Sequence, residues 1–397
     1  MEALEAERII ESLRRGIPPE GHVAEFTVGR EEEINELKSI LLSGSTNALL
    51  IKSNYGSGKT HLLKLTREMA LSSGYAVSLI TLDSKSGVRF NRIDQIFGQV
   101  CRQLEVPGRS GKSVRNLFDL VYSTCFNKNV PEKIKHEILE LSNNGKWDYS
   151  RYLLSNALYV ALRAWCFASP ELQDRIEDWL FQPWEYKTRR KELYDSLVLG
   201  LRRKFYDPRS DVQFYKDNIF NFELLDYQQS WDALNDLDKL AKMAGLKGLI
   251  LLIDEFEDVI HNLGNKNYQQ KAFWNLFQFF GGKYNNLTFF AVTPDFAEKC
   301  KNLLLTKGVY DYDYSLFDEL TAFRMSPLSG SQLFELSKNI VSAHIIAYRW
   351  SGKESVYSNL HAITVQSMQI PVQDRVRQTI KEVVCFLDDM VEDLDGE

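Results

Sequence analysis

The sequence lacks long apolar runs, and its cysteines are few and scattered. The longest apolar stretches are short segments such as LILLI at 249–253, far below the ~18 residues that a membrane-spanning helix needs. The charged N-terminal segment contains no apolar region of the kind found in signal peptides. The five cysteines form no CxxC pair and the six histidines show no metal-ligand spacing. These absences predict a reduced, cytoplasmic protein without a zinc site and without contact to a membrane.

An excess of positive charge is also missing. The chain has 48 Lys and Arg against 54 Asp and Glu, for a net charge of −6. A protein that coats nucleic acid with its whole surface would be strongly basic, so that class is excluded. Hydrophobic residues make up 44% and charged residues 26%, which excludes a disordered, collagen-like or low-complexity chain. The length of 397 residues predicts two or three domains, or one domain with a large insertion.

Short apolar runs that alternate with helical patterns predict an α/β fold. The run ALLIKS at 48–53 has the composition of a buried parallel strand. A glycine-rich loop and a helix from Lys59 to about Ser72 follow it, and YAVSLITLD at 75–83 is the next predicted strand. This order is a βαβ unit, which builds parallel sheets. Later predicted strands are LILLID, LTFFAVT and TAFRMS at 249–254, 287–293 and 321–326.

The remaining segments have helical patterns. The segment from about Asn91 to Gly245 is rich in aromatic residues and contains no convincing strand. Both chain ends also carry apolar residues at spacings of three and four. We therefore predict a core made of two separate stretches, an insertion between them, and helices at both ends. The predicted boundaries are 47–105 and 246–327 for the core, 106–245 for the helical insertion, and 1–46 and 328–397 for the ends.

The sequence SNYGSGKT at 53–60 is a candidate phosphate loop. Gly58, Lys59 and Thr60 match the end of the pattern G-x-x-x-x-G-K-[ST], whereas Ser53 replaces its first glycine. Glycines let backbone N–H groups surround a phosphate at a helix N-terminus. Lysine then contacts the β- and γ-phosphates, and the threonine hydroxyl binds Mg²⁺. The predicted nucleotide-binding residues here are Asn54, Tyr55, Gly56, Ser57, Gly58, Lys59, Thr60 and His61.

Acidic residues end the apolar strand at 249–254. We expect Asp254 to hold Mg²⁺ and Glu255 to polarise the water that attacks the γ-phosphate, because ligands bind at the carboxyl ends of strands in open α/β sheets. Thr293 ends the next strand and either touches the γ-phosphate or simply terminates the strand. The nearest match to a guanine-specific Asn-Lys-x-Asp loop begins at Asn265 and lacks the Asp, which favours adenine.

Four segments together resemble a known group of ATPases. VGREEEINEL, NYGSGKTHLL, LLIDEFED and PLSGSQLFEL resemble the AAA+ and signal-transducing ATPases close to origin-recognition proteins. More narrowly, ERIIESLRRGIPPEG followed by FTVGREEEI resembles the ATP-binding proteins of BREX-type bacterial phage-defence systems. The resemblance covers about 1–105 and 246–397. It implies a P-loop NTPase with the strands in the order 5-1-4-3-2, a C-terminal helical lid, ATP and Mg²⁺ as cofactors, and protein partners in a defence complex.

The resemblance also implies roles for residues outside the two motifs. Val28, Gly29 and Arg30 would line the adenine end of the site. An arginine of the lid would sense the γ-phosphate, and Arg375 is slightly preferred to Arg377 for this role. The alternative for both arginines is a solvated helix face.

One expected feature of the family is missing. An AAA+ ring usually places an arginine finger before the last strand, but no arginine lies between Arg209 and Arg324. The sequence therefore predicts slow hydrolysis, a finger supplied by a partner, or a lysine in its place such as Lys301 or Lys307.

A basic patch at 186–209 adds a further possibility. It holds eight Lys and Arg against three Asp and Glu. It could meet the phosphates of DNA, or be a solvated helix with ion pairs of its own. The leading hypothesis is thus a Mg-ATP-dependent ATPase that acts as a switch or motor subunit in anti-phage defence, with a homo-oligomer as one option for its assembly. The alternatives are an ATP-stabilised scaffold with low turnover and a DNA-loading ATPase.

Overall fold

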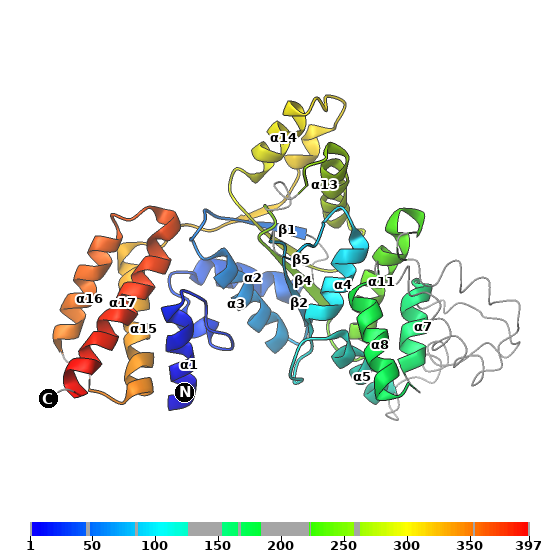
Figure 1. Ribbon diagram of the computed structural model, residues 1–397. Helices are drawn as coiled ribbons and strands as arrows, with labels where there is room; N and C mark the ends of the chain where they lie inside the picture. Colours follow the sequence, from blue (N-terminus) through cyan, green and yellow to red (C-terminus); the bar gives the residue numbers. More distant parts are fainter. Residues whose placement is uncertain are drawn as a thin grey trace, which may run out of the picture.

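The computed structural model describes residues 2–44, 48–83, 86–125, 153–165, 168–183, 222, 224–257, 263–351 and 354–395. These residues form a mixed α/β structure with a six-stranded sheet at its centre. Figure 1 shows helices on both sides of the sheet and a group of C-terminal helices beside it. The predicted α/β class is therefore confirmed. No described helix has the length and apolar character that a membrane crossing requires.

The sheet is parallel except at one edge. Its strands are β1 (Ala48–Lys52), β2 (Ala76–Thr81), β3 (Leu104–Glu105), β4 (Leu249–Asp254), β5 (Thr288–Val292) and β6 (Ala322–Arg324), in the order β3-β2-β4-β5-β1-β6. Only β3 is antiparallel to its neighbour, β2. The carboxyl ends of the parallel strands therefore share one edge of the sheet. The expectation of no strand between Asn91 and Gly245 was wrong, since β3 lies in this range. Its two residues are too few to show the alternating pattern of a strand in the sequence.

Both faces of the sheet are buried. In β4, Leu249, Leu251 and Ile253 pack into one hydrophobic cluster, whereas Ile250 and Leu252 pack into another. Successive side chains of a strand point to opposite faces, so a strand covered on both faces needs apolar residues at every position. This explains why the central strands appear in the sequence as unbroken apolar runs.

Two helices cover one face of the sheet. They are α2 (Glu31–Ser43) and α3 (Lys59–Ser72), which contribute Leu37, Leu41, Leu62 and Leu63 to the same cluster as Ile250. The other face carries α4 (Ile93–Gln103), α11 (Leu224–Met243) and α13 (Lys266–Phe280). Next to α13, α14 (Phe296–Thr306) and the short helix η5 (Tyr314–Phe317) project from the sheet (Figure 1).

The described part of the predicted insertion shares its core with the sheet. It contains α5 (Val114–Cys125), α7 (Asn156–Trp165), α8 (Pro170–Phe181) and α11. Leu158, Trp179 and Leu237 from these helices belong to the same buried cluster as Leu251 of β4. The described helices therefore extend the core on this face of the sheet and do not enclose a separate one.

The C-terminal helices form a bundle with the first helix of the chain. They are α15 (Gly330–Tyr348), α16 (Glu354–Ser367) and α17 (Val372–Asp395), and α1 (Ala3–Arg14) lies against α15 and α17 (Figure 1). Ile9, Ile10 and Leu13 of α1 are buried in the same cluster as Ile340 and Val384. The segment 1–46 is thus divided, because α1 packs on the C-terminal helices and α2 packs on the sheet.

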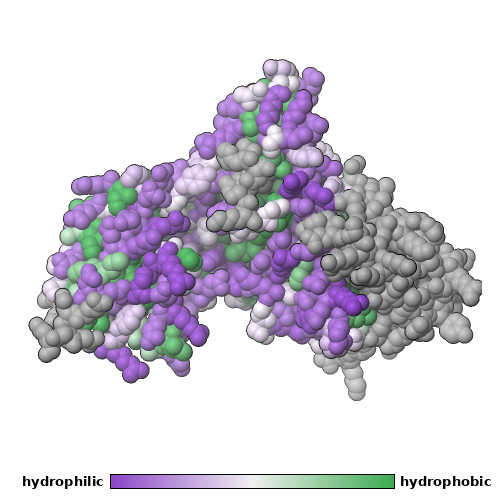
Figure 2. Space-filling model, viewed as in Figure 1, coloured by the Kyte–Doolittle hydropathy of each residue, from purple (hydrophilic) through white to green (hydrophobic). Residues whose placement is uncertain are grey.

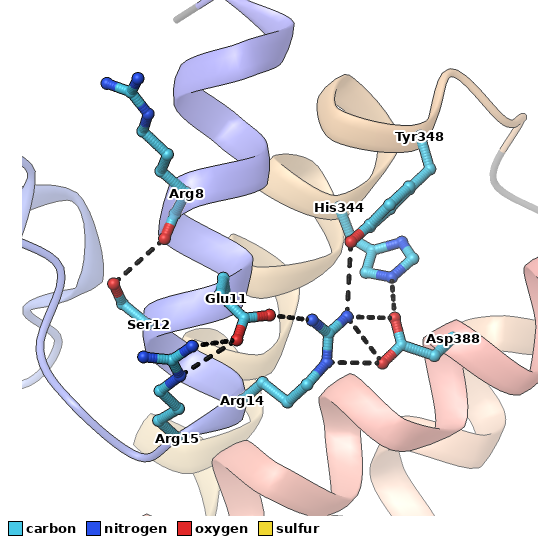
Figure 3. A network of polar contacts seen from close by, with 8 residues as sticks. All are labelled: Arg8, Glu11, Ser12, Arg14, Arg15, His344, Tyr348 and Asp388. Atoms are coloured by element: carbon cyan, nitrogen blue, oxygen red, sulfur yellow. Dashed lines mark hydrogen bonds and ion pairs between the residues drawn. The ribbon is translucent and has the colours of Figure 1, made fainter.

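Polar contacts also tie α1 to this bundle. Arg14 donates hydrogen bonds of 3.0 to 3.1 Å from Nε and Nη2 to both carboxylate oxygens of Asp388 on α17, as Figure 3 shows. Asp388 Oδ1 lies 3.1 Å from Nε2 of the buried His344 on α15. Trp350 Nε1 donates to His344 Nδ1 at 2.9 Å, so this nitrogen is an acceptor and Nε2 carries the proton. The face of the molecule seen in Figure 2 is mostly hydrophilic, and some hydrophobic residues are visible over the C-terminal helices.

Candidate nucleotide-binding site

A cavity of about 620 Å³ lies where the sheet, the loop before α3 and the C-terminal bundle meet. Its volume is typical of small-molecule sites, which span roughly 300–1,000 Å³. Polar residues that lie together form one part of the lining: the loop at 55–60 with Asp254, Glu255 and Glu257. The apolar part of the lining includes Ile17, Phe26, Val28, Leu336, Val376 and Ile380.

The loop between β1 and α3 turns through two glycines. Gly56 has a φ of +70° and Gly58, the N-cap of α3, has a φ of +94°. Residues with a Cβ rarely adopt these left-handed conformations, so both positions require glycine. The loop therefore delivers the first N–H groups of α3 to the cavity, where an anion would find donors and the positive end of the helix dipole.

Lys59 is held inside its own loop. Its Nζ donates to the backbone oxygens of Ser53 at 3.0 Å and Asn54 at 3.3 Å, and it lies 3.6 Å from Glu257 Oε1. The Nζ also lies 4.8 Å from the centre of the Tyr55 ring. Burial lowers the pKa of the Lys59 ammonium, while Glu257 and Asp254 act in the opposite direction.

The two predicted magnesium ligands are in direct contact. Thr60 Oγ1 donates a hydrogen bond of 2.8 Å to Asp254 Oδ2. Burial raises the pKa of the Asp254 carboxyl, and the hydrogen bond from Thr60 partly offsets this effect. A hydroxyl and a carboxylate thus meet in the polar part of the cavity lining, at the carboxyl end of β4.

The acidic residues after β4 differ in their surroundings. Glu255 lines the cavity, is exposed, and has a left-handed φ of +54°, which is uncommon for a residue other than glycine. Glu257 also lines the cavity but is only 4% exposed. Glu257 was not among the residues predicted from the sequence, although the run DEFED contains a second glutamate. Thr293 is buried at the end of β5 and is not part of the cavity lining.

The segment before α2 is only partly at the cavity. Val28 and Arg30 line it, whereas Gly29 lies against Gln332, whose Nε2 would be 2.0 Å from an added Cβ. Arg30 is buried and donates to Ser57 O at 3.2 Å and to Ser326 O at 2.7 Å. Arg30 therefore joins the phosphate loop to the segment that leaves β6.

His61 lines the cavity as a neutral imidazole. Its Nε2 lies 2.7 Å from Thr27 Oγ1, and this hydroxyl donates its hydrogen to Val23 O at 2.7 Å. The hydroxyl must therefore accept from His61 Nε2–H. Burial, with the nearby charges of Arg30 and Lys64, lowers the pKa of His61 to about 4.

The two lid arginines point to different places. Arg375 donates to Ile370 O at 3.2 Å and Met368 O at 3.2 Å, and is not part of the cavity lining. Arg377 does line the cavity, where it packs closely against Gly16. The geometry therefore favours Arg377 as the arginine that senses the γ-phosphate, whereas Arg375 was slightly preferred from the sequence.

The lysines considered as replacements for an arginine finger are not at this site. Lys301 donates to Asp318 at 2.7 Å, and Lys307 donates to Gly264 O and Gln269 Oε1, both at 2.9 Å. Neither lysine is among the residues that line the cavity. The basic patch at 186–209 lies outside the described residues.

A second match to Gly-Lys-[Ser/Thr], the sequence Gly-Lys-Ser at 111–113, also precedes a helix, α5. Here carboxylates of the protein contact the polar groups, because Ser113 Oγ donates to Glu177 and Lys112 Nζ lies 4.0 Å from Glu105. Intramolecular contacts thus account for this loop, and it is not part of the cavity lining.

Several lining residues could not be found from local patterns. Leu13, Gly16, Ile17, Pro18 and Pro19 come from the end of α1 and the segment after it, and Leu336, Val376 and Ile380 come from α15 and α17. They reach the cavity only because the two ends of the chain pack together. A motif within a single stretch of sequence carries no signal of that contact.

A comparison with models of known protein families matches residues 1–145 with the BREX system ATP-binding protein BrxC/D family. No curated protein and no solved structure matches the chain. The matched segment includes Val28 and Arg30, the phosphate loop and α3, all of which contribute to the cavity. In residues 1–145, then, the chain is similar to BREX system ATP-binding proteins, and the narrower resemblance seen in the sequence is confirmed.

Proposed function

We propose that the chain is an AAA+-like P-loop ATPase that binds Mg-ATP in this cavity and acts as a switch or motor subunit of an anti-phage defence system. The observation that carries the proposal is that Lys59, Asp254 and Arg377, which are far apart in the sequence, line one cavity. The five strands predicted from the sequence lie in the order β6-β1-β5-β4-β2, which supports the P-loop assignment. The family match over residues 1–145 supports ATP as the ligand and defence as the context.

The polar part of the lining suits a triphosphate. The glycine-rich turn and the N-terminus of α3 offer N–H donors, and Lys59 supplies a positive charge. In the apolar part, Phe26, Val28 and Ile380 form a hydrophobic wall suited to an adenine ring. The cavity thus offers both a polar lining for the phosphates and an apolar lining for the base of ATP.

Thr60 and Asp254 fit a magnesium ion that arrives with the nucleotide. Among the described residues, no group of three or more His, Cys, Asp or Glu side chains could hold a metal by itself. Mg²⁺ bound to a nucleotide needs only one or two protein groups, because phosphate oxygens and water complete its octahedron. When bound, the ion neutralises charge on the β- and γ-phosphates.

Glu255 is the candidate for activating water. It adjoins Asp254 and is exposed at the cavity, so it can accept a proton from the water that attacks the γ-phosphate. The bond between that phosphorus and the β–γ bridging oxygen then breaks, which gives ADP and phosphate. A group in this role contributes about 10²–10⁴-fold in rate.

Calorimetric titration with ATP and Mg²⁺ tests the proposal. We expect wild-type protein to bind ATP and the Lys59→Ala variant to lose this binding. The Glu255→Gln variant should bind ATP but hydrolyse it at least about 10²-fold more slowly than wild type. Glu335→Gln is a control for loss of one negative charge, because Glu335 forms an exposed pair with Lys338. Hydrolysis by Glu255→Gln at the wild-type rate would remove Glu255 from its assigned role.

A scaffold with low turnover is the second candidate. It is favoured by the absence of arginine between Arg209 and Arg324 and by the intramolecular contacts of Lys301 and Lys307. Steady-state hydrolysis, measured with and without partner proteins and DNA, separates the candidates. A scaffold would show a higher melting temperature with ATP but no stimulated turnover. DNA loading and self-association stay predictions of the sequence.

A further inference from the structure

We propose that Glu257 is a positioning residue that binds the ammonium of Lys59 at the cavity wall and competes with the phosphates of ATP for it. The inference rests on the proposed function, because it concerns how readily the same site accepts a triphosphate. It assigns Glu257 a role different from the water-activating role of Glu255. The two carboxylates are separated by a single residue, Phe256.

The contact between Glu257 and Lys59 is sheltered from water. Glu257 Oε1 lies 3.6 Å from Lys59 Nζ, and the two side chains are only 5% and 9% exposed. Opposite charges attract more strongly in a protein interior than in water, so such a pair holds its geometry. The same Nζ donates to the backbone oxygens of Ser53 and Asn54. Lys59 is thus drawn toward the wall by acceptors that phosphate oxygens would have to replace.

The backbone around Glu257 is anchored. Phe256 is fully buried, and its ring packs 4.7 Å from that of Phe90 and 4.8 Å from that of Phe290. Its N–H donates to Ala291 O at 3.3 Å. Because Phe256 is fixed in the core, its neighbours Glu255 and Glu257 are both held at the cavity. Glu257 is buried beside Lys59, whereas Glu255 remains accessible.

This arrangement opposes movement of Lys59. The carboxylate of Glu257 lies 3.6 Å from the Lys59 ammonium and attracts it toward the wall. The same attraction must be overcome when the ammonium turns to the β- and γ-phosphates. Removal of the Glu257 charge should therefore favour ligands that carry these phosphates, and should not affect a ligand that lacks them.

The experiment compares ATP with AMP. We expect Glu257→Gln, which is nearly isosteric, to tighten the affinity for ATP about tenfold, in line with the loss of one charge-assisted contact. The affinity for AMP should stay unchanged, because AMP has no β- or γ-phosphate to meet Lys59. Titrations are made with Mg²⁺ at low temperature to limit hydrolysis, and Glu335→Gln serves as the control for charge.

Each outcome decides a separate question. If Glu257→Gln binds ATP no more tightly than wild type does, the proposed competition for Lys59 is wrong. If its affinity for AMP rises as much as its affinity for ATP, the effect is a general one of charge and the proposal is also wrong. If wild-type protein binds no ATP, the proposed function fails and this inference fails with it. If Glu257→Gln does not fold, as judged by circular dichroism, Glu257→Asp carries the test. It keeps the charge but shortens the side chain, so ATP should bind more tightly, and an unchanged affinity would overturn the inference.

Discussion

Thr60 Oγ1 donates a 2.8 Å hydrogen bond to Asp254 Oδ2, although 194 residues separate them in the chain. Thr60 is the second residue of α3, which follows β1, and Asp254 ends β4. β5 lies between these two strands in the sheet. The hydrogen bond therefore spans the carboxyl edge of the sheet and joins the phosphate loop to the acidic strand end.

Replacement of Thr60 by valine should weaken the effect of Mg²⁺. The variant keeps the shape of the side chain but removes the hydroxyl, so we expect the gain in ATP affinity on adding Mg²⁺ to shrink. Loss of one hydrogen bond should also lower the free energy of unfolding by about 1 kcal/mol. ATP titrations with and without Mg²⁺ measure the first effect, and urea unfolding measures the second.

Thr66→Val is the matched control for this variant. Thr66 lies on the same helix and donates to Leu62 O at 2.8 Å, but it is not part of the cavity lining. We expect a similar loss of stability with no change in the effect of Mg²⁺. An unchanged Mg²⁺ effect in Thr60→Val would contradict the assignment of Thr60 as a metal ligand.

A Gly56→Ala substitution should disturb both the phosphate loop and α17. Gly56 has a φ of +70°, and an added Cβ would lie 1.5 Å from Gln373 O. One of the two backbones must shift, so we expect weaker ATP binding and a lower melting temperature. Gly74→Ala is the control, because its φ of +89° is strained in the same way but nothing lies within 4 Å. Gly74→Ala should lower the melting temperature without changing the affinity for ATP. An equal loss of ATP affinity in both variants would refute this account.

Loss of the Arg14–Asp388 pair should loosen α1. We expect Arg14→Ala to lower the free energy of unfolding by about 1 kcal/mol, the upper end for exposed ion pairs, because both side chains are partly exposed. A double-mutant cycle with Asp388→Ala should show that the two effects are coupled. ATP affinity should also fall, since Leu13 of α1 lines the cavity. Arg15→Ala, at a side chain that is 68% exposed, should change neither quantity.

Mild acid should lower the stability of the folded protein, because His61 resists protonation in the folded state. Its pKa of about 4 in the folded protein lies below the ~6.5 of an unfolded chain, so the unfolded state binds the extra proton first. The stabilisation is complete above pH ~6.5 and is lost as the pH falls from there toward 4. Urea unfolding between pH 7.5 and 4.5 should show a smaller loss in His61→Gln than in wild type. Parallel curves for the two proteins would contradict a His61 that stays neutral in the folded protein.

Much of the fold was predictable because its signals are local. β1, α3 and β2 follow the apolar runs and the glycines of one βαβ unit, and β4, β5 and β6 each match a predicted strand. The polar part of the cavity lining was predictable for the same reason, since Lys59, Thr60 and Asp254 belong to short motifs. Glu257 was missed because motif spacing does not show which carboxylate after β4 is buried against the lysine.

The amino-acid sequence by itself determined the α/β class, most of the strands and the glycine-rich turn before α3, because helix and strand periods and glycine conformations act over a few neighbouring positions. Only the tertiary structure decided that α1 joins α15 and α17, that Arg377 and not Arg375 reaches the cavity, and that Glu257 contacts Lys59. These relationships depend on the packing of apolar faces from distant segments. That packing is non-directional, so no local pattern specifies which faces will meet.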